Sequence, residues 1–374
     1  MEQKYPRFLS FSYFLLFITL LLYGLIQARE FLYPLAFALL LAYLIFPIVN
    51  FLEKSGFARI LSILIGLFLG IAVIYGIGFF VFKRFGNIIE DFPTLKKQAL
   101  LNIEYFKDGI ESKFGISGDR LETILKNAVT SIFEAGSESF NRMLTSATGT
   151  LVKIGLLPVY IFLFLYYRTK FAYFILKIVP DEKERLTLNI LKNIATVATR
   201  YMGGVFIVVL ILCVINSAGL SLIGLQYPIF LGIISATINF IPYFGTLMGG
   251  AVPLFFALLV EPSPIIAGKV VLLFIFIQFL ENNILTPNIV GSNLQINPFF
   301  IIVGLVASAM IWGIPGMLVI IPGLAVTKII CENIPSLTPI AYLLGPKGTR
   351  RHAITVENTR KLIKRIKGWF GSKA

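Results

Sequence analysis

Residues 228–260 read PIFLGIISATINFIPYFGTLMGGAVPLFFALLV, and this stretch decides the fold. As a single helix it would be about 50 Å long, well beyond the ~30 Å hydrocarbon core of a bilayer. Proline and glycine interrupt it at residues 241–245. Each remaining arm is about 14–16 residues, or about 21–24 Å, which is too short to cross a bilayer comfortably. We therefore predict a broken pair of helices instead of one span.

A second stretch has the same design. Residues 298–330 are equally apolar, and the break falls at residues 313–316. A Leu-Gln pair and a proline occur at the start of each stretch, and the two sets lie about 70 residues apart in the sequence. One ordinary span precedes each stretch. We predict two copies of a span plus a broken pair. If each broken pair is a re-entrant hairpin, the two copies form an inverted repeat. If each is one bent span, the two copies have the same orientation in the membrane. The short arms favour hairpins.

The whole composition is that of a membrane protein. Hydrophobic residues make up 57% of the 374 residues, charged residues make up 14%, and mean hydropathy is +0.85. A soluble domain carries about 25% charged residues, because its surface needs them. We predict an all-α integral membrane protein with about eight hydrophobic segments, at residues 8–26, 31–52, 58–82, 151–167, 205–224, 228–260, 265–284 and 298–330. In the third segment, Gly66 and Gly70 form a GxxxG pair, which is either a helix-packing notch or simply glycine of the kind common in such helices.

The pattern of apolar and charged residues divides the chain into six parts. Between the third and fourth hydrophobic segments the chain becomes polar, with apolar residues at helical spacing, which indicates amphipathic helices outside the bilayer. The predicted parts are three N-terminal transmembrane helices (1–82), an extramembrane amphipathic segment (83–146), a fourth transmembrane helix (147–168), a cytoplasmic amphipathic segment (169–202), a transport core of two span-plus-hairpin repeats (203–333) and a basic cytoplasmic tail (334–374).

The net charge of +14 indicates the orientation in the membrane. Basic residues gather beside apolar segments, at the N-terminus, in the turn around Lys54 and Arg59, at residues 168–200 and in the tail. This placement favours lipid headgroups over nucleic acid as the partner, and it follows the positive-inside rule. We expect a cell inner membrane protein with both termini in the cytoplasm and residues 83–146 outside. The tail is expected to carry a basic helix at 359–370 that lies on anionic lipid.

The residues themselves argue against several classes of function. The cysteines Cys213 and Cys331 each lie in an apolar stretch, and the single histidine, His352, lies in the basic tail. No zinc-binding pattern, P-loop or GxSxG elbow is present in the sequence. We therefore expect no catalytic residues, no metal site and no cofactor, and we do not expect an enzyme.

Polar side chains gather within the seventh hydrophobic segment. Gln278, Glu281 and Asn282 lie together there, and a charged residue inside a membrane helix costs ~2.5–3.5 kcal/mol on insertion scales, so it usually has a function. Glu281 is a candidate for binding a cation or a proton, and Asn239 in the first broken pair is expected to meet it. Alternatively, Glu281 lies near the end of its span and faces water.

The two breaks supply the other candidate binding residues. A hairpin tip exposes backbone N–H and C=O groups at membrane depth, where they are tolerated only if protein buries them or water reaches them. Pro242, Tyr243 and Gly245 at the first tip, and Gly313 and Pro315 at the second, are therefore predicted to contact the substrate or ion.

These motifs together resemble the autoinducer-2 exporter family of bacterial and archaeal membrane proteins. The resemblance rests on residues 157–167, on Asn239–Gly245, on the run from Gln278 to Gly291 with Glu281 and Pro287, and on Asn297-Pro298 followed by Gly313, Gly316 and Pro322. It covers almost the whole chain. It implies a transporter-like, oligomeric protein with about eight hydrophobic segments. Members have been linked to export of autoinducer-2 and to sodium/proton exchange, so the resemblance implies no single substrate.

Taken together, we expect a multi-pass transporter of a small polar molecule or ion, acting as an exporter or as an ion-coupled secondary transporter. Alternating access at the hairpin tips is the expected mechanism, coupled to Na⁺ or H⁺ at Glu281. The expected partners are the bilayer, the solute and further copies of the chain. A cation/proton antiporter, a channel and a membrane scaffold without coupled transport stay open as alternatives.

Overall fold

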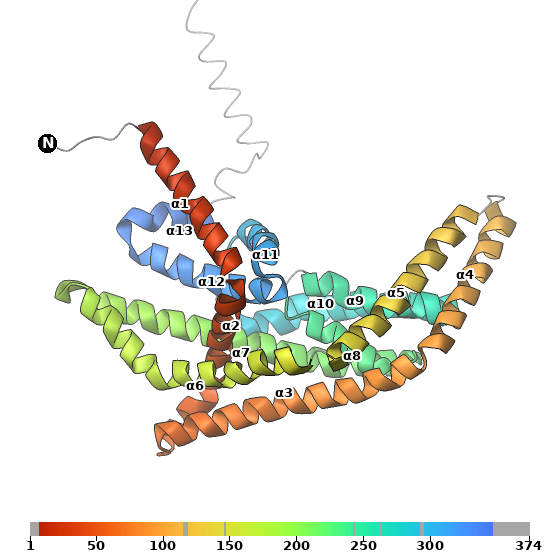
Figure 1. Ribbon diagram of the computed structural model, residues 1–374, viewed down its shortest axis with the longest axis horizontal. Helices are drawn as coiled ribbons and strands as arrows, with labels where there is room; N and C mark the ends of the chain where they lie inside the picture. Colours follow the sequence, from red (N-terminus) through yellow and green to blue (C-terminus); the bar gives the residue numbers. More distant parts are fainter. Residues whose placement is uncertain are drawn as a thin grey trace, which may run out of the picture.

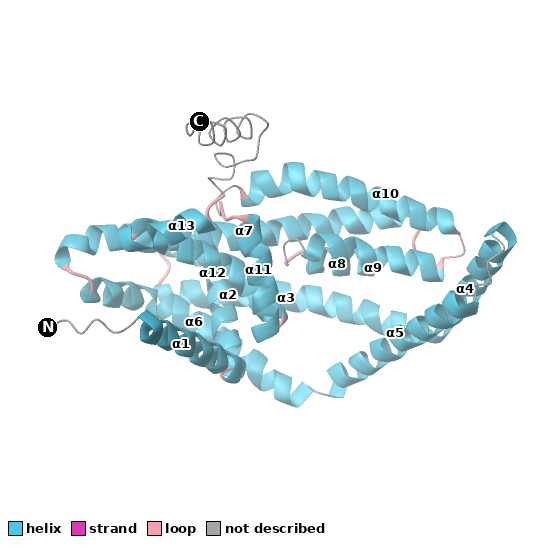
Figure 2. Ribbon diagram, turned by 90° about the horizontal axis from the view of Figure 1, so that it is seen from above, coloured by secondary structure: helices cyan, strands magenta, loops and turns pink. Residues whose placement is uncertain are grey.

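The structure is a computed structural model that describes residues 7–114, 119–145, 147–241, 244–261, 263–291 and 295–346. Within these ranges the chain is helical, and no strand is found (Figures 1 and 2). The all-α prediction is confirmed. The elements are α1 (Arg7–Gln27), α2 (Arg29–Lys54), α3 (Arg59–Glu90), α4 (Phe92–Phe114), α5 (Asp119–Thr145), α6 (Ala147–Ile178), η1 (Asp181–Lys183), α7 (Glu184–Ile223), α8 (Pro228–Ile238), α9 (Phe244–Val260), α10 (Pro264–Leu280), the π-helix η2 (Glu281–Val290), α11 (Pro298–Trp312), α12 (Ile314–Asn333), η3 (Pro335–Leu337) and α13 (Thr338–Leu344).

Six stretches of helix in the described part are long and apolar enough to cross a bilayer. They are Arg29–Lys54, Arg59–Phe79, Gly155–Ile178, Asp181–Ile223, Pro264–Val290 and Ile314–Asn333. Shorter apolar helices occur at Leu15–Gln27, Pro228–Ile238, Met248–Val260 and Pro298–Trp312. The chain is thus a multi-pass membrane protein, and the exact number of crossings stays a prediction.

Both long apolar stretches break close to the predicted residues, the second within 313–316 and the first beginning two residues before 241. In the first, α8 ends at Ile238 and α9 begins at Phe244, and the two helices fold back on each other. The backbone at Gly245 lies against Asn239, and a Cβ at Gly249 would come within 2.9 Å of the Ser235 carbonyl oxygen. Contacts that pair later residues of α9 with earlier residues of α8 define an antiparallel hairpin.

The second broken pair is also a hairpin. Gly316 near the start of α12 lies against Ser308, and a Cβ at Gly304 would come within 3.0 Å of Ile320. The chain reverses at Gly313 alone, which has φ +65°, a conformation that glycine adopts without steric cost. Two hairpins are therefore present, and their relation as an inverted repeat stays a prediction.

Several helices continue past the predicted limits of the parts. The 40-residue α7 joins the predicted cytoplasmic segment and the predicted span without a break at residue 202. The Gly203–Gly204 pair does not interrupt it. Gly204 instead allows a close helix contact, since a Cβ there would come within 2.9 Å of the Val290 Cα. Where the membrane surface meets α3, α6 and α7 stays a prediction.

The helices pack around three main apolar clusters. The largest joins α7, α8, α11, α12 and the end of α10, and the second joins α4, α7, α8, α9 and α10. The third joins α2, α3 and α6. There the GxxxG pair is a packing notch, since Cβ atoms at Gly66 and Gly70 would come within 2.8 Å of Val49 and 3.1 Å of Ile45. These clusters hold the two hairpins against the long helices.

The predicted extramembrane segment forms an arm of two helices, α4 and α5, which projects from the bundle in Figure 1. The base of the arm contacts the first hairpin. The Asn102 side chain donates to the Leu259 carbonyl at 2.9 Å and to the Glu261 carbonyl at 3.0 Å, and Tyr227 donates to Asp91. The arm thereby holds the end of the α8–α9 hairpin that lies opposite its tip.

Two lysines bind the carboxylate of Glu122 in the arm, Lys107 at 2.8 Å and Lys126 at 2.7 Å. Their hydrogen bonds lower the pKa of Glu122 from 4.5 to about 2. A lowered folded-state pKa adds stability that is present above pH 4.5 and lost as the pH falls toward 2.

We expect the carboxyl carbon of Glu122, identified in NMR spectra by its absence from Glu122→Gln, to titrate with a midpoint near pH 2. A midpoint near 4.5 would show that the lysines do not hold it in solution.

Candidate functional site

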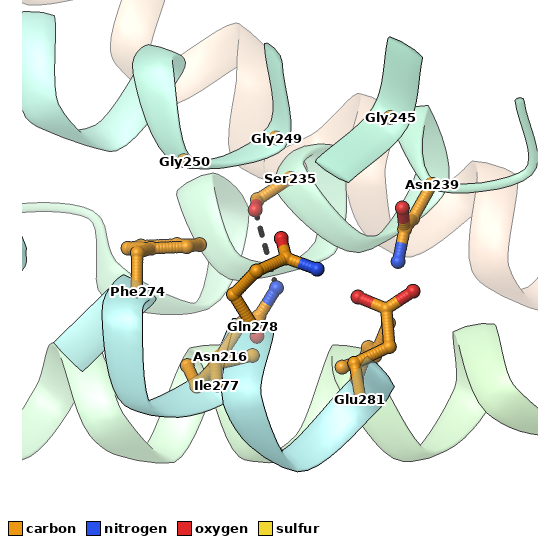
Figure 3. Close-up of a pocket in the computed structure, with 11 residues that line it drawn as sticks. Asn216, Ser235, Asn239, Gly245, Gly249, Gly250, Phe274, Ile277, Gln278 and Glu281 are labelled. Carbon is orange, nitrogen blue, oxygen red and sulfur yellow. Dashed lines mark hydrogen bonds between the residues drawn. The ribbon is translucent and has the colours of Figure 1, made fainter. Parts of the chain in front are cut away.

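A small cavity lies between α7, the α8–α9 hairpin and the end of α10. Figure 3 shows polar side chains from these elements directed toward one another. The backbone at three glycines of α9 forms one side of the cavity, and side chains of α10 form the other. The lining residues are Leu212, Asn216, Ser235, Asn239, Gly245, Gly249, Gly250, Phe274, Ile277, Gln278 and Glu281.

Glu281 supplies the charge of this cavity. Glu281 is only 8% exposed, and the Asn239 side-chain amide interacts with its carboxylate (Figure 3). No basic residue is among the described residues that line the cavity. Within the described part of the chain, Glu281 forms no ion pair. The alternative that Glu281 faces open water does not fit this burial.

The π-helix η2 begins at Glu281, and its sequence explains why α10 does not simply continue. Pro287 has no N–H to donate, so a regular α-helical bond is lost. The side chains of Asn283 and Asn288 donate to the carbonyl oxygens of Phe279 and Ile284 at 2.8 and 2.7 Å, which satisfies acceptors in the altered turns. π-Turns inside α-helices are frequent at functional sites.

Two polar lining residues were not found from the sequence, Asn216 on α7 and Ser235 on α8. Both are 3% exposed, and the Asn216 side-chain nitrogen donates to the Ser235 hydroxyl at 3.2 Å. Ser235 precedes Asn239 by one helical turn, so both reach the same face of α8. An isolated amide in the apolar run of α7 was the available signal for Asn216. Only the fold brings it to Glu281.

The amide groups leave hydrogen-bonding capacity for a bound molecule. Asn216 Oδ1, Asn239 Oδ1 and Gln278 Nε2 are buried and have no partner among the described residues. Buried polar atoms are otherwise paired in the great majority of cases. The cavity therefore offers a carboxylate, two free amide oxygens and one free amide nitrogen.

The structure unites some predicted site residues and separates others. Gln278, Glu281, Asn239 and Gly245 line the cavity together. Asn282 is exposed and does not line it, because the next helical position points about 100° away.

The second hairpin tip also lies outside the cavity lining, and with it Gly313 and Pro315. The Trp312 indole at this tip donates to the Leu25 carbonyl of α1 at 3.0 Å. Pro242 and Tyr243 lie outside the described residues.

Multi-pass membrane transport proteins share these features: apolar helices long enough to span a bilayer, short hairpins, and a polar cavity among them. The chain belongs to the family described as "AI-2E family transporter", whose model matches residues 14–336. The resemblance seen in the sequence is confirmed.

Curated relatives carry names of the same kind. "Putative transport protein YrrI" of Bacillus subtilis (strain 168) is 39% identical over 129 residues, which cover 34% of this chain and 36% of that protein. "Putative transport protein YueF" of the same organism is 27% identical over 217 residues, covering 57% and 58%. A "Putative transport protein" of Borreliella burgdorferi is 28% identical over 151 residues, covering 39% and 41%. The chain thus aligns with less than two thirds of the length of each of these relatives.

Proposed function

We propose that the cavity is the binding site of a transporter for a small cation or small polar molecule, working as an exporter or as an ion-coupled secondary transporter. One observation carries the proposal: Glu281 is buried in a cavity with no basic residue among its described lining, beside amides whose oxygens are free. A carboxylate in a membrane protein is costly unless a partner neutralises it. A transported or coupling cation is such a partner.

The donor set favours a hard cation. Carboxylate, amide carbonyl and hydroxyl oxygens suit alkali and alkaline-earth ions, and the described lining presents no sulfur or imidazole ligand. In Figure 3 the Asn239 nitrogen faces Glu281. Rotation of this amide by half a turn would present its free oxygen to a bound ion.

Cation/proton antiport is the second candidate function, because the same carboxylate can take either a cation or a proton. A site that holds one or the other, but not both, couples their movements in opposite directions. The isolation of Glu281 from other charged side chains in the described cavity lining supports this candidate.

The arrangement of the elements supports alternating access. Ser235, Asn239 and Gly245 belong to the α8–α9 hairpin, whereas Asn216 and Glu281 belong to the long helices α7 and α10–η2. Movement of the hairpin tip relative to these helices would open and close the cavity. The base of the hairpin stays held by the arm through Asn102.

The same proposal covers the location, orientation and assembly of the protein. Both termini would lie in the cytoplasm, the membrane would be the cell inner membrane, and several copies of the chain would assemble. No cofactor is required, because ion gradients can supply the driving force.

The test is flux in proteoliposomes that contain the purified protein, with Na⁺ and H⁺ gradients imposed separately. We expect saturable flux that follows one of the two gradients. High, non-saturating conductance in a planar bilayer would indicate a channel instead. No flux of any cation or small polar solute would indicate a scaffold, and either result would reject the proposal.

A further inference from the structure

A cluster of charged side chains joins α2, α3 and α6 at the N-terminal end of α3. Arg168 on α6 donates from Nη2 to the carboxylate of Glu53 on α2. Arg59, the first residue of α3, donates to Thr169 Oγ1 at 3.1 Å and to the Leu165 carbonyl at 3.0 Å. We call Glu53, Arg59 and Arg168 the two-arginine cluster. None of its residues lines the cavity at Glu281.

The charges of the two-arginine cluster do not balance. Arg59 lies within electrostatic range of both Arg168 and Glu53, so two guanidinium groups share one carboxylate. Arg59 Nε and Arg168 Nη1 are buried atoms without an acceptor in the described part of the chain, and Glu53 Oε1 is without a donor there. One positive charge is left over, with free N–H groups, in a partly desolvated place. Such a group favours binding of an anion.

The surroundings of the cluster are those of a membrane–water interface. The Arg59 guanidinium lies 5.9 Å from the centre of the Tyr166 ring, and the Arg168 guanidinium lies 5.2 Å from that of Phe46. Tyr166 and Tyr167 are exposed, as tyrosines are where a protein meets headgroups. Exposed lysines Lys54 and Lys170 flank the cluster and add to its positive charge.

We infer that the two-arginine cluster binds a phosphate group, and that its source is the headgroup of an anionic phospholipid. A planar guanidinium donates two parallel hydrogen bonds to phosphate oxygens, and flanking lysines add point charges. Exposed Leu64 on α3 and Leu163 on α6 provide apolar surface near the cluster for acyl chains. A lipid bound here ties the turn between α2 and α3 to α6. Free phosphate is the other source of the same chemistry, and the experiment separates the two.

The experiment measures phospholipid binding to the purified full-length chain by native mass spectrometry, with phosphatidylglycerol and phosphatidylcholine titrated separately. We expect phosphatidylglycerol to bind at least about fivefold more tightly, because only it carries net negative charge. Arg59→Gln, and separately the double change Lys54→Gln with Lys170→Gln, should each remove most of this preference. Lys177→Gln is the matched control, since Lys177 is an exposed lysine of α6 that lies over Tyr173, outside the cluster.

The results distinguish a lipid headgroup from free phosphate as the ligand, and some of them would overturn the inference. If inorganic phosphate alone raises the thermal stability of the wild type but not of Arg59→Gln, and phosphatidylglycerol shows no preference, the ligand is free phosphate. If both ligands bind Arg59→Gln and the lysine double variant as they bind the wild type, the inference is overturned. An equal loss in Lys177→Gln would also overturn it. Should Arg59→Gln fail to fold, the lysine double variant decides, because its exposed side chains form no hydrogen bond in the described part.

Discussion

Glu281→Gln is expected to reduce gradient-driven transport about tenfold or more while leaving the fold intact. Glutamine keeps the shape of the side chain and can still bond with Asn239, but it removes the charge in the cavity. A contact to a charged group contributes roughly 1.5–3 kcal/mol, which corresponds to about a 10- to 100-fold change in affinity. The measurement is initial flux in proteoliposomes as a function of cation concentration and of pH.

Two further variants make the Glu281 result specific. Glu182→Gln changes an exposed acid in η1 and should transport like the wild type. Glu281→Asp keeps the charge on a shorter side chain and should recover part of the cation dependence. Unchanged coupling in Glu281→Gln would remove Glu281 from the site.

Gly232→Ala is expected to destabilise the protein by roughly 1–3 kcal/mol and to lower transport with it, as overpacking does in other cores. Gly232 lies where α8 crosses α7, and a Cβ there would come within 2.5 Å of both the backbone nitrogen and the hydroxyl oxygen of Ser217. Backbone cannot move aside as a flexible side chain can, so α8 must shift away from α7. That shift would separate Ser235 from Asn216, which are now hydrogen-bonded.

Gly268→Ala is the matched control for this prediction. Gly268 is an exposed glycine of α10, and nothing lies within 4 Å of a Cβ built there. Alanine is also the better helix former by about 1 kcal/mol, so this variant should be as stable as the wild type or more stable. The measurement is the thermal unfolding midpoint in detergent together with flux. Equal stability of Gly232→Ala and Gly268→Ala would show that α7 and α8 are not closely packed.

The breaks in the helices could be predicted from the sequence because their cause is local. Proline removes a backbone donor and glycine permits positive φ, so the break at residues 241–245 and the reversal at Gly313 are visible in the sequence. The arithmetic of arm length then favours hairpins. By the same local rules, however, the Gly203–Gly204 pair resembles a break, and α7 runs straight through it. Gly204 is the point of close contact with Val290, a residue that is distant in the sequence, so this use of the glycine cannot be predicted locally.

Only the part of the candidate site that depends on local sequence could be predicted. Gln278 and Glu281 share a helix face, so their proximity follows from helical spacing. Asn216 and Ser235 join them only through the packing of α7 against α8, which no local pattern encodes. Asn282 adjoins Glu281 in the sequence yet faces away from it. The second hairpin tip was inferred by analogy with the first, and its Trp312 instead bonds to α1.

The central claim is that water and the transported ion reach the cavity beside Glu281. Its most direct test is the rate at which a membrane-impermeant thiol reagent labels Gln278→Cys, in a chain whose two native cysteines, Cys213 and Cys331, are replaced by alanine. Gln278 lines the cavity, whereas Phe276 lies on the same helix, is exposed and is predicted to face lipid. We predict that the thiol of Gln278→Cys is labelled, that this labelling slows as the transported cation is added, and that Phe276→Cys is not labelled. Equal labelling of the two variants, or a Gln278→Cys variant that no condition labels, would contradict the account.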